Sequence, residues 1–187
     1  MEVIKTALEG VLILEPRIFT DGRGYFFECY NQREFLAKTG LDVTFVQDNE
    51  SFSTYGVLRG LHFQKGEYAQ AKLVRVIEGK VLDVAVDIRK GSPTFGKWTA
   101  VELSGENHRQ FFIPRGFAHG FSVLSPTARF QYKCDNFYAP GQEGAIAWND
   151  PDLAIDWQLP ASAVQLSEKD SRHPLLKDSP YLFEYSK

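Results

Sequence analysis

The 187-residue sequence predicts an all-β domain, a sandwich or barrel built from short strands. Glycine and other turn-forming residues recur every few positions between Gly10 and Gly144, and the runs between them are rich in Val, Ile and Phe. Aromatic residues make up 14% of the chain, which is typical of a thick β core or of surfaces that stack on flat ligands. A hydrophobic fraction of 43% is that of a globular protein.

Ten runs of β-branched and aromatic residues, bounded by turn residues, fit the pattern of strands. Between two of these runs, the tripeptide Glu78-Gly79-Lys80 predicts a tight hairpin. In chain order, the expected strands are Val11–Pro16, Tyr25–Tyr30, Val43–Asn49, Gly56–Gln64, Ala71–Glu78, Lys80–Ile88, Trp98–Leu103, Gln110–Ile113, His119–Leu124 and Ala128–Cys134.

One α-helix is expected in the first quarter of the chain. Asn31 can cap its N-terminus, and Glu34 stands three residues later, where a capping-box partner belongs. Phe35 and Leu36 supply an apolar face, and Gly40 can end the helix in the left-handed conformation. The sequence therefore predicts a short helix between the second and third strands.

The chain from Asn149 onward is rich in Pro and Asp, and a helical turn can start at Ser167. No linker, repeat or low-complexity tract separates this segment from the strands. We therefore expect residues 1–187 to form a single domain, in which the last segment covers the barrel.

Alternation along two strands predicts which side chains face the core. Phe130, Tyr132 and Cys134 share one face of their strand, and this apolar face should point inward and carry Tyr132 with it. Asp83 and Asp87 lie on the less apolar face of another strand. That face either meets solvent or lines a polar pocket.

Composition excludes several classes of function. A net charge of −3 gives the chain no overall basic character, so duplex nucleic acid is not an expected partner. No apolar run approaches the ~20 residues that a membrane-spanning helix needs. Met1–Gly10 carries three charges and does not resemble a signal peptide. Cys29 and Cys134 lack metal-type spacing, so a reduced pair in a cytoplasmic protein is expected.

The segment Arg59–Trp98 concentrates residues that are costly to bury. His62 lies in an apolar run, either as a core histidine with a satisfied hydrogen bond or as a general base, since its pKa near neutrality suits proton abstraction. A base of this kind needs a carboxylate to orient it. Asp83, Asp87 and Asp170 are all candidates, and their spacing does not choose between them.

Each of the other candidate residues also has two possible roles. Lys72 is either a surface lysine at a strand end or a cation aimed at a developing oxyanion. Tyr132 is either a core aromatic or a proton donor in a polar cavity, and His119 has either a structural or a ligand-binding role. Arg23 and Arg59 each adjoin a glycine and are either solvated or clamp a phosphate.

No metal or cofactor motif is present. His62 stands without the His-x-His pair of a metal-binding cupin, and His108 and His173 lie in polar surroundings that indicate surface positions. The sequence also lacks a P-loop and a Gly-rich dinucleotide fingerprint. We therefore expect neither a metal centre nor a cofactor.

Nine runs of the sequence together match the motifs of a known family. They are Gln47–Ser51, Leu58–Gln64, Gln70–Val74, Asp83–Asp87, Gly91–Gly96, Ile113–Phe121, Tyr132–Cys134, Trp148–Asp152 and Leu166–Asp170. In this order, and over nearly the whole chain, they resemble the dTDP-4-dehydrorhamnose 3,5-epimerases of the dTDP-L-rhamnose pathway. The loop at residues 65–69 lacks the Pro often found there, and the segment after Asp170 matches loosely.

The resemblance implies a metal-free, cupin-type jelly-roll β-barrel that needs no cofactor. It also implies a dTDP-4-keto-6-deoxy sugar as substrate and a homodimer in which an N-terminal strand crosses to the partner. His62 would be the base, Tyr132 the acid and Lys72 the stabiliser of the enolate, and Asp170 would pair with His62. The implied substrate contacts are Arg23 and Glu28 from the swapped strand, together with Gln47, Asp48, Asn49, Arg59, Lys72, His119, Glu143, Lys169 and the thymine-stacking Tyr138.

Two alternatives remain open. The chain could be an epimerase that acts at one carbon only, or on another 4-keto deoxysugar nucleotide, because such relatives keep the same His, Lys and Tyr. It could also be a cupin that binds sugar nucleotides without catalysis. The joint presence of His62, Lys72, Tyr132 and Asp170 argues against the second alternative.

Overall fold

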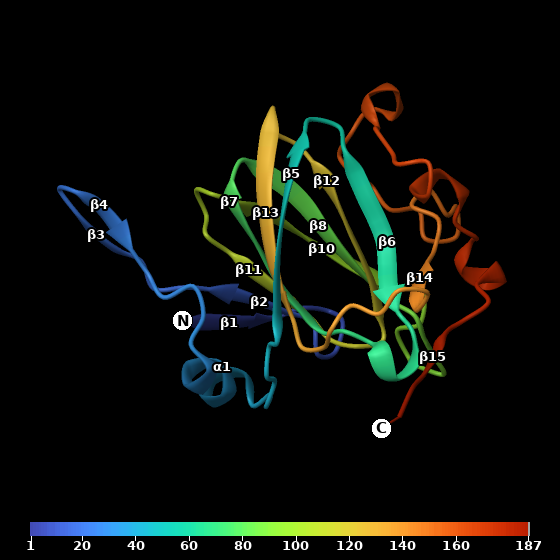
Figure 1. Cartoon of the computed structure of the whole chain (residues 1–187), viewed down its shortest axis with the longest axis horizontal. Helices are drawn as coiled ribbons and strands as arrows, with labels where there is room; N and C mark the ends of the chain where they lie inside the picture. The colour runs from blue at the N-terminus through green and yellow to red at the C-terminus, as the bar shows by residue number, and fades with distance from the viewer. Residues whose placement is uncertain (187) are drawn as a thin grey trace.

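A computed structural model describes residues 1–186, and most of the ordered backbone is antiparallel β-structure (Figure 1). Within these residues the helix α1 spans Gln32–Thr39, and short 3-10 helices span Gly66–Tyr68, Ala161–Ala163, Asp170–Arg172 and Leu176–Asp178. The strands are β1 Glu2–Lys5, β2 Leu12–Glu15, β3 Phe19–Asp21, β4 Gly24–Phe26, β5 Gln47–Thr54, β6 Leu58–Gln64, β7 Lys72–Glu78, β8 Lys80–Asp87, β9 Arg89–Lys90, β10 Trp98–Ser104, β11 Gln110–Ile113, β12 Phe117–Val123, β13 Thr127–Cys134, β14 Glu143–Ala145 and β15 Phe183–Glu184.

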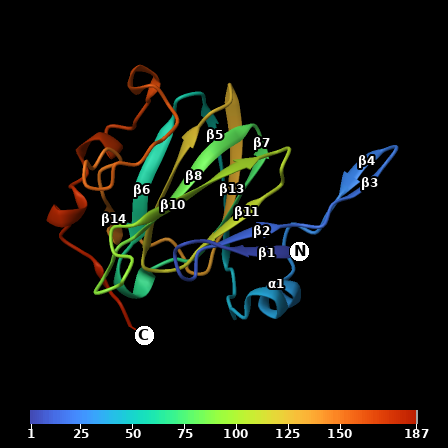
Figure 2. The same ribbon diagram turned by 180° about the vertical axis from the view of Figure 1, so that it is seen from behind.

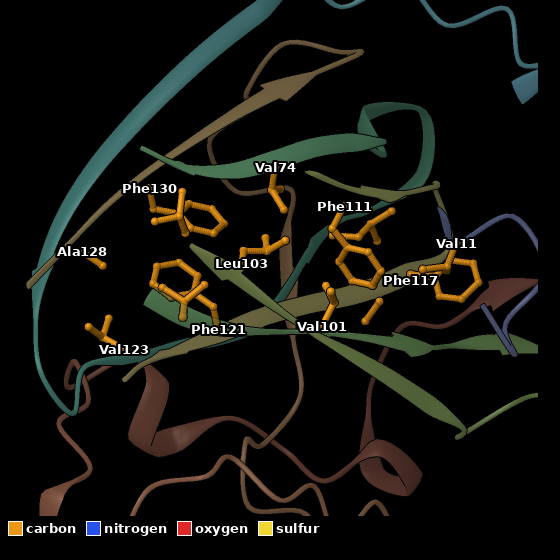
Figure 3. Packing of buried hydrophobic residues seen from close by; sticks show 14 of the residues in the cluster. Val11, Val74, Val101, Leu103, Phe111, Phe117, Phe121, Val123, Ala128 and Phe130 are labelled. Atoms are coloured by element: carbon orange, nitrogen blue, oxygen red, sulfur yellow. The ribbon is translucent and has the colours of Figure 1, made fainter. Parts of the chain in front are cut away.

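Within residues 1–186, two large sheets face each other. The larger has the strand order β1-β2-β11-β7-β13-β5 and the smaller has the order β10-β8-β12-β6-β14. Their inner faces pack together, and Phe121 of β12 stacks on Phe130 of β13 with ring centroids 4.2 Å apart. Figure 3 shows this interior cluster, in which Phe111 and Phe130 approach Val101 and Phe121. The all-β prediction is confirmed.

A second apolar layer lies on the outer face of the smaller sheet. Leu82, Val84 and Val86 of β8 pack there against Leu153 and Trp157 of the C-terminal segment. Both views show this segment, coloured orange to red, running along the side of β6 and β14 (Figures 1 and 2). The aliphatic face of β8 therefore points outward, beneath the C-terminal segment, and its other face points into the barrel.

The helix α1 begins and ends where the sequence predicts. The Asn31 side chain accepts a hydrogen bond from the backbone N–H of Glu34 at 3.2 Å, and Gly40 ends the helix at φ +74°. The Glu34 carboxylate, however, does not complete a capping box. It pairs instead with the amino group of Met1 at 2.9 Å, which fixes the chain start beside the helix.

The strand expected at Val43–Asn49 is misplaced, because β5 runs over Gln47–Thr54. Phe45 belongs to no strand and packs beside Phe35 of α1. Leu36, expected on the apolar face of the helix, is exposed. β5 is an edge strand whose outer face meets solvent, so its sequence is polar and the hydrophobic pattern does not mark it.

The tight hairpin expected at Gly79 is also wrong. β7 belongs to the larger sheet and β8 to the smaller, so the turn carries the chain from one sheet to the other. Gly79 has φ +81°, and a Cβ there would lie 2.0 Å from the carbonyl oxygen of Thr127. Only glycine fits this crossing without moving the backbone.

The strand expected at Tyr25–Tyr30 ends at Phe26, and it forms the hairpin β3–β4 with an unforeseen strand. This hairpin, in blue, projects away from the barrel in both views (Figures 1 and 2). Phe19, Tyr25 and Phe26 are 50 to 68% exposed. The short strands β1, β9, β14 and β15 were likewise not foreseen, because two to four residues carry too little pattern.

Candidate active site

Two adjoining cavities of about 750 Å³ and 300 Å³ open between β6, β7, β13, β14 and the C-terminal segment. The larger lies toward Tyr138 and Tyr181, and the smaller reaches into the barrel toward His119 and Phe121. Five side chains line both cavities and mark their junction: His62, Lys72, Tyr132, Glu143 and Lys169. The structure therefore brings the expected base, acid and enolate stabiliser to one place.

The carboxylate that pairs with His62 is Asp170. His62 lies on β6 and directs Nε2 at the Oδ1 atom of Asp170 within hydrogen-bonding distance. Asp170 is only 5% exposed and opens a 3-10 turn. Ser167 fixes it from the other side, since its hydroxyl donates to Oδ2 at 2.7 Å and accepts the backbone N–H of Asp170 at 3.1 Å.

The ionisation of Asp170 sets the tautomer of His62. Burial alone would raise the pKa of Asp170, but the hydrogen bond and charge of His62, with help from Ser167 and His173, lower it to about 2. The ionised carboxylate can only accept hydrogen bonds, so Nε2 of His62 carries the hydrogen. The lone pair of the neutral imidazole is then on Nδ1, which is the atom available to remove a proton.

His173 lies beside His62 and Asp170, so the prediction that it is a surface residue is wrong. Its side chain is almost fully buried, and its Nε2 is 3.3 Å from Oδ1 of Asp170. Its ring meets that of His62 edge-on, with centroids 5.6 Å apart. Burial and the neighbouring His62 lower the pKa of His173. The polar sequence around His173 gave no sign of this position.

Lys72 and Tyr132 reach the same junction from the opposite sheet. They lie on β7 and β13, and the Lys72 ammonium is 5.7 Å from the centroid of the Tyr132 ring. Burial lowers the pKa of Lys72 and raises the pKa of Tyr132. The phenol therefore keeps its proton near neutrality, as a proton donor must. Parity along β13 correctly predicted that Tyr132 points inward.

His119 forms a second imidazole–carboxylate pair deeper in the barrel. Its Nε2 lies 2.8 Å from Oδ1 of Asp83, and both side chains are buried. Burial lowers the pKa of His119, although Asp83 opposes the change. Asp83 is thus buried in the barrel beside His119 and does not face solvent. Asp87, the third candidate partner of His62, pairs instead with Arg89 at 2.8 Å, outside the cavities.

The other expected substrate contacts either line one of the two cavities or lie apart from both. Arg59 lines the smaller cavity, and Tyr138 lines the larger one. Gln47 and Asn49 lie on the partly buried face of β5, where their side chains share a hydrogen bond of 3.0 Å and Gln47 accepts the backbone N–H of Tyr138. Glu143 and Lys169 form an ion pair at the junction of the cavities.

Gln47 and Asn49 line neither cavity, and three further expected contacts also lie away from both cavities within one chain. Asp48 sits on the exposed face of β5 and pairs with Lys133 at 2.8 Å. Arg23 lies at the tip of the β3–β4 hairpin, with its side chain 91% exposed and paired with Asp21. Glu28 lines a separate cavity of about 370 Å³ beside α1.

Sequence reasoning missed several lining residues. Tyr181 and Arg172 border the larger cavity, and both follow Asp170, where the motifs match loosely. Gln64 lines the same cavity and donates hydrogen bonds to the backbone carbonyls of Tyr68 and Phe137. Its place two residues after His62 on β6, hence on the same face, is the one signal that could have found it.

The donor atoms of His62, Asp170 and His173 lie within 4.8 Å of one another, so these three side chains could hold a metal ion.

Among residues 1–186 no helix is long and apolar enough to cross a membrane. Cys29 and Cys134 are not paired with each other.

Comparison with known proteins shows what the chain resembles. The family model described as dTDP-4-dehydrorhamnose 3,5-epimerase matches residues 5–178. The curated dTDP-4-dehydrorhamnose 3,5-epimerase of Salmonella typhimurium is 60% identical over 179 residues, which cover 94% of this chain and 96% of that protein.

Solved structures agree over the same length. A dTDP-6-deoxy-D-glucose-3,5-epimerase from Legionella pneumophila, in complex with dTDP-4-keto-L-rhamnose, superposes with a TM-score of 0.95 at 50% identity, covering 100% of this chain and 99% of that one. A 3'-monoepimerase from Streptomyces bikiniensis, in complex with dTDP-quinovose, gives 0.86 at 34% identity, covering 95% and 88%. These likenesses confirm the cupin-type jelly roll.

Proposed function

The chain belongs to the dTDP-4-dehydrorhamnose 3,5-epimerase family, and we propose that the junction around His62 carries out the family's reaction. That reaction inverts C3 and C5 of dTDP-4-dehydro-6-deoxy-D-glucose and gives dTDP-4-dehydro-L-rhamnose, so the chain is an isomerase of dTDP-L-rhamnose biosynthesis. One observation carries the assignment of residues. His62 on one sheet, paired with Asp170 of the C-terminal segment, lines the same cavities as the Lys72 ammonium and the Tyr132 phenol on the other sheet.

Proton removal is the task of His62. The C4 ketone acidifies the hydrogens on C3 and C5, because the carbanion at either carbon is an enolate. Nδ1 of His62 takes each proton, and the ionised Asp170 stabilises the imidazolium that results. Since the ketone is already present in the substrate, these proton transfers need no redox cofactor.

Lys72 and Tyr132 complete the reaction from the other sheet. The Lys72 ammonium donates to the enolate oxygen, where negative charge develops. Tyr132 returns a proton to C5 on the face opposite His62, and Tyr132 or water does so at C3. Inversion requires a base and an acid on opposite faces of the ring, and this is supported by their origin in facing sheets.

The remaining contacts hold the nucleotide. We assign Arg59 and His119 to the sugar and diphosphate near the smaller cavity, and Tyr138 to stacking on thymine at the mouth of the larger one. Glu143 and Lys169 sit between them. The further contacts implied for this chain are Gln47, Asp48, Asn49, Arg23 and Glu28, of which Asp48 has the weakest support because it faces solvent.

A homodimer accounts for Arg23 and Glu28. The β3–β4 hairpin exposes three aromatic rings, a costly arrangement unless another surface covers them. β5 is an unpaired edge of the larger sheet and is the natural place for a partner's strand to add. The proposed exchange would carry Arg23 into the partner's cavity.

Mixing two defective variants tests this exchange. Arg23→Ala and His62→Ala are each expected to lose activity, and their mixture should regain it because some mixed dimers hold one intact site. Light scattering of the unsubstituted protein should give twice the chain mass. A monomer at micromolar concentration, or no recovery on mixing under conditions that exchange subunits, would contradict the dimer.

Solvent isotope exchange tests the reaction itself. The chain is incubated in D2O with dTDP-4-dehydro-6-deoxy-D-glucose, and label at C3 and C5 is followed by NMR. Label should enter both carbons, and His62→Ala should remove most of it. Absence of label at both carbons with folded protein would refute the proposed function.

The same experiment separates the alternatives. Label and inversion at one carbon only would identify a mono-epimerase, like the relative from Streptomyces bikiniensis. Ligand-induced thermal stabilisation without any label would identify a binding protein. We also propose that the chain acts as one domain and works in the cytoplasm, where its two thiols would stay reduced.

A further inference from the structure

We propose that the cluster of His62, Asp170 and His173 is an inhibitory binding site for a divalent transition-metal ion, of which Zn²⁺ is the best match. Two imidazoles and one carboxylate are a ligand set that zinc takes in proteins. The site is not a cofactor site, because its occupation removes the base of the proposed reaction. The inhibition, though not the binding, rests on that proposed function.

The geometry of the three donor atoms suits zinc. Nε2 of His62 and Nε2 of His173 both point at Oδ1 of Asp170, and all three atoms lie within 4.8 Å of one another. In a tetrahedral site with bonds of ~2.1 Å, neighbouring ligand atoms are ~3.4 Å apart. The separation of His173 Nε2 from Asp170 Oδ1 is 3.3 Å. A slight outward turn of the His62 ring would bring its Nε2 to the same separation from Asp170 Oδ1.

The surroundings favour the ion as well. Ser167 holds Oδ2 of Asp170 with its hydroxyl at 2.7 Å, so the carboxylate presents Oδ1 alone to the imidazoles. Such outer-shell hydrogen bonds orient ligands and raise metal affinity. His62 is half-exposed to the cavity, which gives the ion a route in and leaves a fourth coordination position for water.

Binding would inactivate His62 without filling the sugar pocket. When Nε2 of a neutral imidazole ligates a metal, the ring hydrogen is on Nδ1. In the metal-free site the ionised Asp170 holds that hydrogen on Nε2 and leaves Nδ1 basic. Zinc at Nε2 therefore moves the hydrogen to Nδ1, and the ring keeps one hydrogen throughout. The atom that removes the substrate proton is then already protonated.

His173 is the residue that makes this site possible. Of the three ligands, only His62 and Asp170 have a part in the proposed reaction, and two ligands alone bind zinc weakly. His173 supplies the third donor from the same C-terminal segment, three residues after Asp170. Replacing it with glutamine keeps a polar side chain of similar reach but removes the imidazole.

Isothermal titration of the full chain with ZnCl2 tests binding, and the visible absorption of bound Co²⁺ tests tetrahedral coordination. We expect one ion per chain. Since loss of an outer-shell partner alone costs roughly 10- to 100-fold in affinity, His173→Gln should weaken binding at least about tenfold. Cys29→Ser is the matched control, because it removes an exposed thiol that could also take zinc, and it should bind zinc as the unsubstituted chain does.

Isotope exchange with and without zinc tests inhibition. One equivalent of zinc should suppress exchange, EDTA should restore it, and His173→Gln should need at least about ten times more zinc for the same fractional loss. Zinc affinity unchanged in His173→Gln, with that variant folded by circular dichroism, overturns the site. Zinc bound at this cluster without loss of exchange overturns the inhibition. Absence of exchange in the metal-free chain refutes the proposed function instead and leaves the titration to judge the site.

Discussion

Replacing Asp170 with asparagine isolates the charge of the carboxylate from its shape. In the folded protein Oδ1 of Asp170 accepts from His62 and His173, and Oδ2 accepts from the Ser167 hydroxyl. The asparagine carbonyl is best placed at the Oδ1 position, facing two donors, and its NH2 then faces the Ser167 oxygen. The tautomer of His62 is kept, and only the negative charge is lost.

The pKa of Asp170 sets the size of the effect. A fall from the usual 3.8 to about 2 means that the ionised carboxylate and its partners stabilise one another by roughly 2 kcal/mol. The imidazolium of His62 forms during proton removal and depends on that charge. Its loss should slow isotope exchange roughly 30-fold. If the amide were reversed, the wrong tautomer would be held and the loss would approach ~10⁴-fold, as in serine proteases.

The assay is the initial rate of deuterium incorporation at C5, measured for Asp170→Asn and the unsubstituted chain at saturating substrate. Asp87→Asn is the matched control, because Asp87 is a buried carboxylate paired with Arg89 outside the cavities. Its rate per folded molecule should match that of the unsubstituted chain. An Asp170→Asn rate within threefold of the unsubstituted rate would show that the charge of Asp170 does not support the base.

Three further predictions concern the acid, the pH dependence of stability and the fold. Tyr132→Phe should keep measurable label exchange while inverted product falls ~10²- to 10⁴-fold, because removal of the proton survives without the opposing acid; equal losses of exchange and inversion, measured by NMR, would argue against this role. Burial would raise the pKa of Asp87, but Arg89 and two hydroxyls lower it overall, so its contribution to stability is complete well above the unfolded pKa of about 4 and is lost as pH falls through the lower folded pKa. Thermal unfolding should therefore show a steeper loss of stability below about pH 4 in the unsubstituted chain than in Asp87→Asn, and parallel curves would contradict the assignment. Gly79→Ala should cost more than ~1 kcal/mol in urea denaturation, because its Cβ meets the Thr127 carbonyl at 2.0 Å and φ is +81°; an unchanged midpoint would contradict the clash.

The elements that the sequence predicted well are those with complete local signals. The helix has a cap at each end, in Asn31 and Gly40. The strand Gln110–Ile113 consists of one polar residue followed by three large apolar ones, and its predicted bounds were correct. The turn at Gly79 shows the limit of such signals. A glycine between two apolar runs predicts a reversal of the chain, but strand pairing is a long-range property, and here the two runs enter opposite sheets.

The site shows a similar division. Parity placed Tyr132 inside the barrel, because the alternation along β13 is regular. Spacing could not choose the partner of His62, since Asp170 lies 108 residues away in the sequence and joins it only when the C-terminal segment folds over the barrel. His173 escaped notice for the same reason. Its neighbours in the sequence are polar, while its neighbours in space are His62 and Asp170, the proposed base and its partner.

The stacked pair of Phe121 and Phe130 lies between the two sheets that carry the proposed base and acid. These rings lie 15° from parallel with centroids 4.2 Å apart, and Phe130 stands two residues before Tyr132 on the same face of β13. Both rings border the inner cavity. Because the proposed base and acid belong to different sheets, no backbone ladder joins them, and the side chains packed between the sheets, this pair among them, hold the two groups apart. Selection or design could therefore change the distance between the two groups by replacing one of these rings, without replacing His62 or Tyr132.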